Sequence, residues 1–156
     1  MGLLRDPVHF LAFGFGSGLS PRAPGTAGSL VGLVIAWWLV ALPFGARVGA
    51  VAIVIAAGTW LCGESARRLG RHDDQRIVLD EIAGVLLTSM AVAEKSLFAF
   101  ALLFVLFRIF DIAKPWPIRD VDHRLHGGLG IILDDLIAAV FAAICVVIVR
   151  ELLPTI

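Results

Sequence analysis

Apolar residues in this chain are grouped into five runs that carry no charge. The runs cover residues 26–42, 48–63, 82–93, 96–107 and 136–149. None shows the alternation of apolar and polar residues that a membrane barrel needs, so the pattern predicts helices. Each run is shorter than the roughly 20 residues that cross a bilayer comfortably. We therefore expect local thinning of the bilayer or helix ends buried in protein, and the run 82–93 is the weakest candidate for a full crossing.

The composition points to a membrane protein. The chain has 156 residues, about the length of one domain. Hydrophobic residues make up 59% and charged residues 17%, where about 25% charged is usual. A soluble domain of this size has too much surface to cover with so few polar residues. These values exclude a disordered chain and predict one all-α domain over residues 1–156, a multi-helix integral membrane bundle with short spans and no sheet. The net charge of zero gives no basic footprint for nucleic acid.

Basic residues are distributed unevenly between the runs. If the N-terminus is cytoplasmic and all five runs cross, three basic residues lie outside, namely Arg47, Lys95 and Arg150. The ten on the cytoplasmic side are Arg5, Arg22, Arg67, Arg68, Arg71, Arg76, Arg108, Lys114, Arg119 and Arg124. The positive-inside rule therefore predicts a multi-pass chain with its N-terminus inside and its C-terminus outside. Nearly all the acids fall on the same side, Asp73, Asp120 and Asp122 included, which predicts a working surface at the cytoplasmic face.

A glycine-rich segment, residues 14–29, directly precedes the first run. The backbone N–H groups of such a loop bind anions, with help from the N-terminus of the following helix. Arg22 adds a side chain suited to bidentate contact with phosphate. The alternative is an irregular lead-in in which Thr26 or Ser29 only caps the helix. The spacing alone does not decide between the two.

Two pairs of adjacent acids stand just before apolar runs. Asp80 and Glu81 precede the run 82–93, and Asp134 and Asp135 precede the run 136–149. One acid is enough to cap a helix and to interact with its dipole, an effect of about 1 kcal/mol or less. Two adjacent carboxylates at a membrane boundary are costly to desolvate and indicate a cation partner. Because Mg²⁺ prefers carboxylate oxygens, we expect the two pairs to converge on Mg²⁺.

A third charged cluster ends the fourth run. Arg108, Asp111 and Lys114 follow one another at intervals of three and share one helical face, before Pro115 stops the helix. The simple interpretation is a ladder of ion pairs with snorkelling side chains. The same arrangement also suits a phosphate site beside a metal.

Four segments of the chain, in the same order, resemble the phosphatidylglycerophosphatase A family. They are residues 16–29, 77–84, 107–118 and 127–135, and the resemblance runs over about the whole chain. It implies a magnesium-dependent enzyme of the bacterial cytoplasmic (inner) membrane with a phospholipid substrate. That enzyme removes the terminal phosphate of phosphatidylglycerophosphate and gives phosphatidylglycerol. Ile132 stands where methionine is common in the family.

The resemblance assigns roles to residues already singled out. The catalytic candidates are Asp80, Glu81, Asp111, Asp134 and Asp135. The expected Mg²⁺ ligands are Asp80, Glu81, Asp134 and Asp135. The expected phosphate-binding residues are Arg22, Thr26, Arg108 and Lys114. The number of metal ions, the choice between direct water attack and an aspartyl-phosphate, and the oligomeric state, a homo-oligomer included, stay open.

The alternative function is a small helical membrane transporter or channel with ionisable residues lining a pathway. Against it, the acids stand at the ends of runs on one predicted side, and no inverted repeat is apparent in the sequence.

Overall fold

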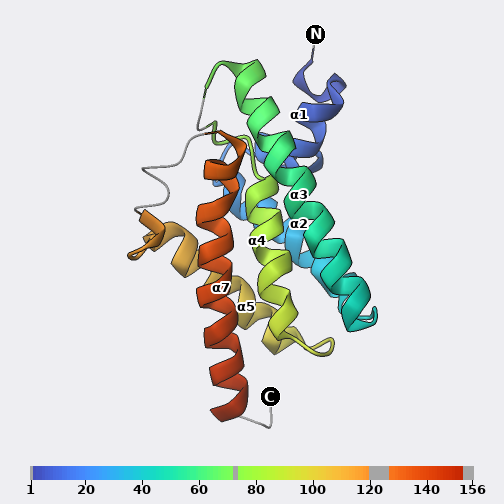
Figure 1. The fold of residues 1–156 in the computed structure, drawn as a ribbon, viewed down its shortest axis with the longest axis vertical. Helices are drawn as coiled ribbons and strands as arrows, with labels where there is room; N and C mark the ends of the chain where they lie inside the picture. Colours follow the sequence, from blue (N-terminus) through green and yellow to red (C-terminus); the bar gives the residue numbers. More distant parts are fainter. Residues whose placement is uncertain (1, 72–73, 120–126, 153–156) are drawn as a thin grey trace.

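The computed structural model describes residues 2–71, 74–119 and 127–152, and over these ranges it contains helices and no strand. Its α-helices are α1 (Pro7–Ala12), α2 (Pro24–Leu39), α3 (Phe44–Leu69), α4 (Leu79–Thr88), α5 (Leu97–Ala113) and α7 (Gly128–Leu152). Three short 3₁₀ segments are η1 (Leu3–Arg5), η2 (Gly14–Leu19) and η3 (Ser89–Ala91). Figure 1 shows α3, α4 and α7 side by side, with the two ends of the chain at opposite ends of the bundle. The prediction of an all-α fold is confirmed.

Each of the five apolar runs lies largely within one helix, but the boundaries differ from those expected. α7 begins at Gly128, eight residues before the run 136–149, so the acid pair that precedes this run lies inside the helix. Ile132 is buried in this first part of α7 and Ile131 packs on the core, which favours helix despite the glycines. Asp134 and Asp135 therefore lie in the second turn of a helix and not at its start.

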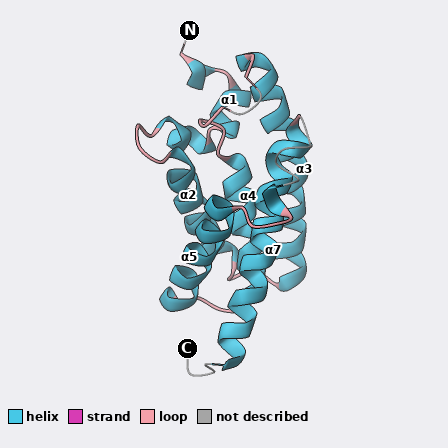
Figure 2. Ribbon diagram, turned by 90° about the vertical axis from the view of Figure 1, so that its left-hand side faces the viewer, coloured by secondary structure: helices cyan, strands magenta, loops and turns pink. Residues whose placement is uncertain are grey.

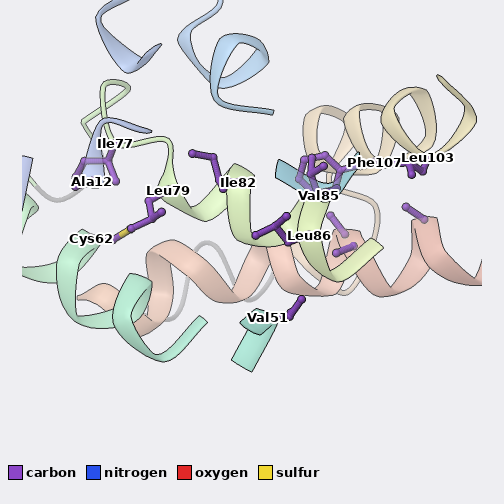
Figure 3. Packing of buried hydrophobic residues seen from close by; sticks show 14 of the residues in the cluster. Ala12, Val51, Cys62, Ile77, Leu79, Ile82, Val85, Leu86, Leu103 and Phe107 are labelled. Carbon is purple, nitrogen blue, oxygen red and sulfur yellow. The ribbon is translucent and has the colours of Figure 1, made fainter. Parts of the chain in front are cut away.

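α4 alone is shorter than the hydrocarbon core of a bilayer, so a crossing at this point of the chain also needs η3 and the segment that follows it. Its ten residues span about 15 Å, half of a hydrocarbon core about 30 Å thick. It lies at the centre of the bundle, packed against α2, α3, α5 and α7. Figure 3 shows its side chains Leu79, Ile82, Val85 and Leu86 among the buried residues of the other helices. The third apolar run is thus the core helix of the protein.

Among the helices that the structure describes, α3 and α7 are long and apolar enough to cross a membrane. Only 17% of the most apolar stretch of α3 is buried inside the protein, and 39% of that of α7. Large apolar side chains such as Ile53 and Trp60 on α3 and Ile148 on α7 are exposed. An apolar surface of this extent is disfavoured in water and indicates membrane association.

The ends of the bundle differ in character. One end, which we call the distal end because it lies away from the start of α4, comprises the turn 40–43 and the segment 89–96 (Figure 1). Arg47, 4% exposed, donates there to the carbonyl oxygens of Ser89 and Val92 at 2.7 and 2.8 Å. Arg150 donates to the carbonyl of Ala91 at 2.8 Å. The three basic residues expected outside lie at this end, while Arg67 and Arg68 lie in the last turn of α3 at the opposite end and Arg71 just beyond it. Asp73, Asp120, Asp122 and Arg124 lie outside the described residues.

The N-terminal helix α1 was not expected from the apolar pattern. Its first residue is Pro7, and the Asp6 side chain caps it by accepting from the backbone N–H of Val8 at 2.9 Å. Asp followed by Pro is a typical start signal for a helix, so this helix could have been predicted from the sequence.

The backbones of α3 and α7 are in close contact at Gly128, and this contact predicts the effect of a substitution on stability. A Cβ at Gly128 would lie 1.8 Å from the carbonyl oxygen of Thr59, so Gly128→Ala forces the helices apart. We expect a loss of about 1–3 kcal/mol in unfolding free energy, the usual cost of overpacking. Thermal unfolding of the detergent-solubilised protein measures this effect. Gly49→Ala in α3, where nothing lies within 4 Å of the added Cβ, is the control and should be neutral or stabilising. Equal melting temperatures for the two variants would contradict the tight contact.

Candidate active site

Three carboxylates from two helices meet beside the core. Asp80 and Glu81 belong to the first turn of α4, and Asp135 belongs to α7. One oxygen from each lies within 4.8 Å of the other two. We call this group the carboxylate site. Asp135 is 4% exposed, and Glu81 Oε2 is buried with no hydrogen-bond partner among the described residues.

The donor set of the carboxylate site fits a hard divalent cation. Three negative groups this close repel one another, and their burial adds a desolvation cost. A cation with oxygen ligands offsets both effects, and the unpartnered Glu81 oxygen is placed to act as a ligand. The residues present therefore fit Mg²⁺ bound between α4 and α7.

The segment before α4 is fixed to the N-terminal part of the chain. The backbone N–H of Val78 donates to the carbonyl of Ala12 at 2.9 Å. Asp74 accepts from the Arg76 side chain at 2.6 and 2.7 Å. These hydrogen bonds from Arg76 lower the pKa of Asp74 although its burial opposes the shift. The start of α4, and with it Asp80, is thus held in place.

The glycine-rich segment reaches the site at the first turn of α2. A Cβ at Gly25 would lie 2.4 Å from Glu81 Oε1 and 3.4 Å from Arg108 Nη1, so a larger residue there would displace the Glu81 carboxylate. Ser29 Oγ, one turn further, donates to the Gly25 carbonyl at 2.9 Å and accepts from Arg108 Nη1 at 3.3 Å. α2 therefore brings its N-terminus against both an acid and a base of the site.

Arg108 links α5 to the site. Its Nη1 donates to Asp111 Oδ2 as well as to Ser29. Its Nε is buried and has no hydrogen-bond partner among the described residues. The predicted ion pair within α5 is present, and the Nε donor of the guanidinium is left for a further acceptor.

Lys114 and Asp134 form the other charged contact. Lys114 ends α5 in a left-handed conformation (φ 40°), which is uncommon for a residue with a side chain. Its Nζ donates to Asp134 Oδ2 at 2.7 Å. Asp134 and Asp135 point to different partners because neighbours on a helix face about 100° apart. The structure thus divides the four expected metal ligands: Asp80, Glu81 and Asp135 are together, and Asp134 pairs with lysine.

The expected residues of the glycine-rich segment take different positions. Thr26 is half-buried in the first turn of α2, next to Gly25. Arg22 is exposed, and its side chain makes no hydrogen bond or ion pair with any residue the structure describes. Sequence reasoning gave Ser29 only a capping role and did not single out Gly25. Only their place in the glycine-rich segment pointed to the site.

The chain is similar to known proteins over most of its length. The family model for phosphatidylglycerophosphatase A matches residues 10–150 of the chain. The chain belongs to the phosphatidylglycerophosphatase A family. This confirms the resemblance seen in the sequence, and with it the prediction of a phosphatase.

Curated relatives cover most of both chains. Phosphatidylglycerophosphatase A of Escherichia coli is 44% identical over 140 residues, which are 90% of this chain and 81% of the relative. The Haemophilus influenzae protein of the same name is 42% identical over 145 residues, 92% and 88% of the two chains. A candidate phosphatidylinositol-3-phosphatase of Bacteroides thetaiotaomicron is 37% identical over 146 residues, 88% and 89%. No solved structure is significantly similar to this one.

Proposed function

We propose that the chain hydrolyses phosphatidylglycerophosphate to phosphatidylglycerol and inorganic phosphate, with Mg²⁺ as cofactor, at the cytoplasmic face of the membrane. The observation that carries the proposal is the meeting of the carboxylate site with Arg108 and the first turn of α2. Family membership supports the reaction and the substrate. In the net reaction the P–O bond to the lipid glycerol breaks. The hydroxyl of a water goes to phosphorus and its proton to the released lipid hydroxyl.

The basic residues of the site are proposed to hold the phosphoryl group. Arg108 is fixed at Nη1 by Asp111 and Ser29 and offers its buried Nε to a phosphoryl oxygen. Lys114 adds a second positive charge, held beside the site by Asp134. Preorganised donors of this kind stabilise the charge on the equatorial oxygens of a phosphoryl transition state. Asp111 and Asp134 thus act by positioning the two basic groups.

The carboxylate site is proposed to hold the cofactor through Asp80, Glu81 and Asp135. When bound, Mg²⁺ supplies charge neutralisation of the phosphoryl oxygens and a more acidic water. The protein contributes a partly buried setting, in which these electrostatic effects are larger than in water, because Asp135 is buried and Asp80 and Glu81 are half-buried.

Hydrolysis of a defined set of lipids tests the function. Purified protein in detergent micelles with Mg²⁺ is given phosphatidylglycerophosphate, phosphatidic acid, phosphatidylinositol 3-phosphate or glycerol 3-phosphate, and free phosphate is measured. We expect phosphatidylglycerophosphate to be hydrolysed with the highest kcat/KM. If phosphatidylinositol 3-phosphate were preferred, this chain would have the activity for which the Bacteroides protein is named. Release from none of them would contradict the proposal.

Cysteine labelling tests the proposed sidedness. We expect a cysteine at Arg71, beyond the charged end of α3, to be protected from an impermeant thiol reagent in intact cells, and one at Lys95 to react. The reason is the separation of the basic residues between the two ends of the bundle. The unsubstituted chain is the control, because its own Cys62 is buried and Cys145 half-buried in apolar helices. Labelling at position 71 from outside would overturn the topology.

A further inference from the structure

α2 and α5 form an antiparallel pair that leads away from the site. At the site, Arg108 near the end of α5 contacts Ser29 near the start of α2. At the other end, the rings of Trp37 and Phe100 meet edge to face, with centroids 4.9 Å apart. Figure 2 shows the two helices on the same side of the molecule. Any feature between them therefore runs from the charged site towards the distal end.

An apolar groove of about 320 Å³ lies between these two helices. Trp37 and the buried Phe100 form its floor. Its walls are exposed side chains, Val34 and Trp38 from α2 and Leu97 and Ala101 from α5. The volume is at the lower end of the range of about 300–1,000 Å³ found for ligand sites. No charged residue lines the groove.

Exposed apolar residues connect the groove to the level of the site. On α2, Leu30 lies one turn before Val34 and next to Ser29. On α5, Val105 and Ile109 continue the stripe of Ala101 as far as Arg108. Residues four apart share a helix face, so the two stripes border one continuous apolar track. The track thus begins at the hydrogen-bonding Arg108, continues along an apolar lining, and ends below Lys95, whose Nζ lies 4.5 Å from the centroid of the Trp38 ring.

We propose that the groove between α2 and α5 binds one acyl chain of the lipid substrate while its phosphate lies at Arg108. This inference rests on the proposed function and extends it to a chain-binding subsite. The distance suits one leaflet: Ser29 and Trp37 are eight residues apart, about 12 Å along α2, and half of a hydrocarbon core is about 15 Å. The Arg108 guanidinium at one end and the apolar lining that follows it match the phosphate and one acyl chain of a phosphomonoester lipid.

Filling the groove tests the proposal. Ala101 is the small residue of the wall, so Ala101→Phe narrows the groove without touching the site. We expect kcat/KM for dioleoyl phosphatidylglycerophosphate to fall about tenfold, through KM, because lost apolar contacts weaken binding by this order. The dihexanoyl substrate, whose chains are too short to fill the groove, should be unaffected. Ala56→Phe, on the exposed face of α3, is the matched control and should change neither value.

The comparison separates the two proposals. If the unsubstituted chain releases phosphate from the dihexanoyl lipid, and Ala101→Phe leaves kcat/KM unchanged for both lipids or lowers it equally for both, the groove is overturned and the function stands. No release from either lipid by the unsubstituted chain would overturn the function.

Photolabelling of the unsubstituted protein provides a measurement that does not depend on a variant. The probe is phosphatidylglycerophosphate with a diazirine in the middle of one acyl chain, in vesicles of phosphatidylcholine. We expect labelling of residues 33–38 and 97–105, suppressed by unlabelled substrate. Labelling spread equally over the exposed apolar residues of α7, such as Ile144 and Ile148, and insensitive to competition would overturn the subsite.

Discussion

Asp80→Asn is expected to lower kcat/KM for phosphate release about a thousandfold. The substitution keeps the shape of the side chain and removes one of the three carboxylates that lie within 4.8 Å of one another. If this group holds Mg²⁺, the ion's contribution of several kcal/mol is lost, and each 1.36 kcal/mol is a factor of ten in rate. Steady-state phosphate release from phosphatidylglycerophosphate micelles at saturating Mg²⁺ measures the effect.

A stability measurement separates this loss from misfolding. Without metal, one negative charge fewer relieves repulsion at the carboxylate site, so Asp80→Asn should unfold at the same or a higher temperature than the unsubstituted chain. Added Mg²⁺ should raise the melting temperature of the unsubstituted chain more than that of the variant. Glu94→Gln, an exposed acid in the segment 89–96 of the distal end, is the control and should keep full activity. Full activity in Asp80→Asn would leave the site without a metal-binding role.

Arg108→Lys is expected to lower kcat/KM at least about tenfold, equivalent to about 1.4 kcal/mol of transition-state stabilisation. Arg108 uses Nη1 for Asp111 and Ser29 and keeps a buried Nε for the substrate. Lysine retains the charge but has neither the planar fork nor a second nitrogen, so it cannot serve both sets of partners. Kinetics together with thermal unfolding check the prediction, and the melting temperature should be unchanged.

The simple ion-pair interpretation of Arg108 makes a different prediction. A lysine would keep the positive charge opposite the half-buried Asp111, so the kinetics of Arg108→Lys would then be nearly unchanged. Arg67→Lys provides the matched control, because Arg67 is exposed and pairs with Glu64 on the same helix. Wild-type kinetics in both variants would show that the ion pair is the whole role of Arg108.

Much of the architecture followed from the spacing of apolar residues. Each run became a helix, because a chain with so few polar residues must satisfy its backbone internally. The pattern did not reveal that α4 is a short central helix, since a buried helix and a spanning one are both apolar. The pattern also did not predict the surroundings of Arg47. The sequence indicates only a positive charge on the outer side of the membrane, whereas in the structure Arg47 is buried against two carbonyl groups.

The candidate site, like the fold, could be predicted from the sequence only in part. The acidic pairs were visible in the sequence because adjacent acids before apolar runs are costly without a partner. Their actual grouping depends on side-chain direction along α7, which places Asp135 with Asp80 and Asp134 with Lys114. The contact of Gly25 with Glu81 joins residues 56 positions apart, and no local pattern encodes it.

The central claim is that the carboxylate site works through a bound divalent metal on phosphatidylglycerophosphate. The most direct measurement is phosphate release by the purified chain after removal of metal with EDTA, followed by stepwise addition of Mg²⁺. Our account predicts no release in EDTA, full recovery with Mg²⁺ in the unsubstituted chain, and no recovery in Asp80→Asn or Asp135→Asn. Undiminished phosphate release in excess EDTA would contradict it.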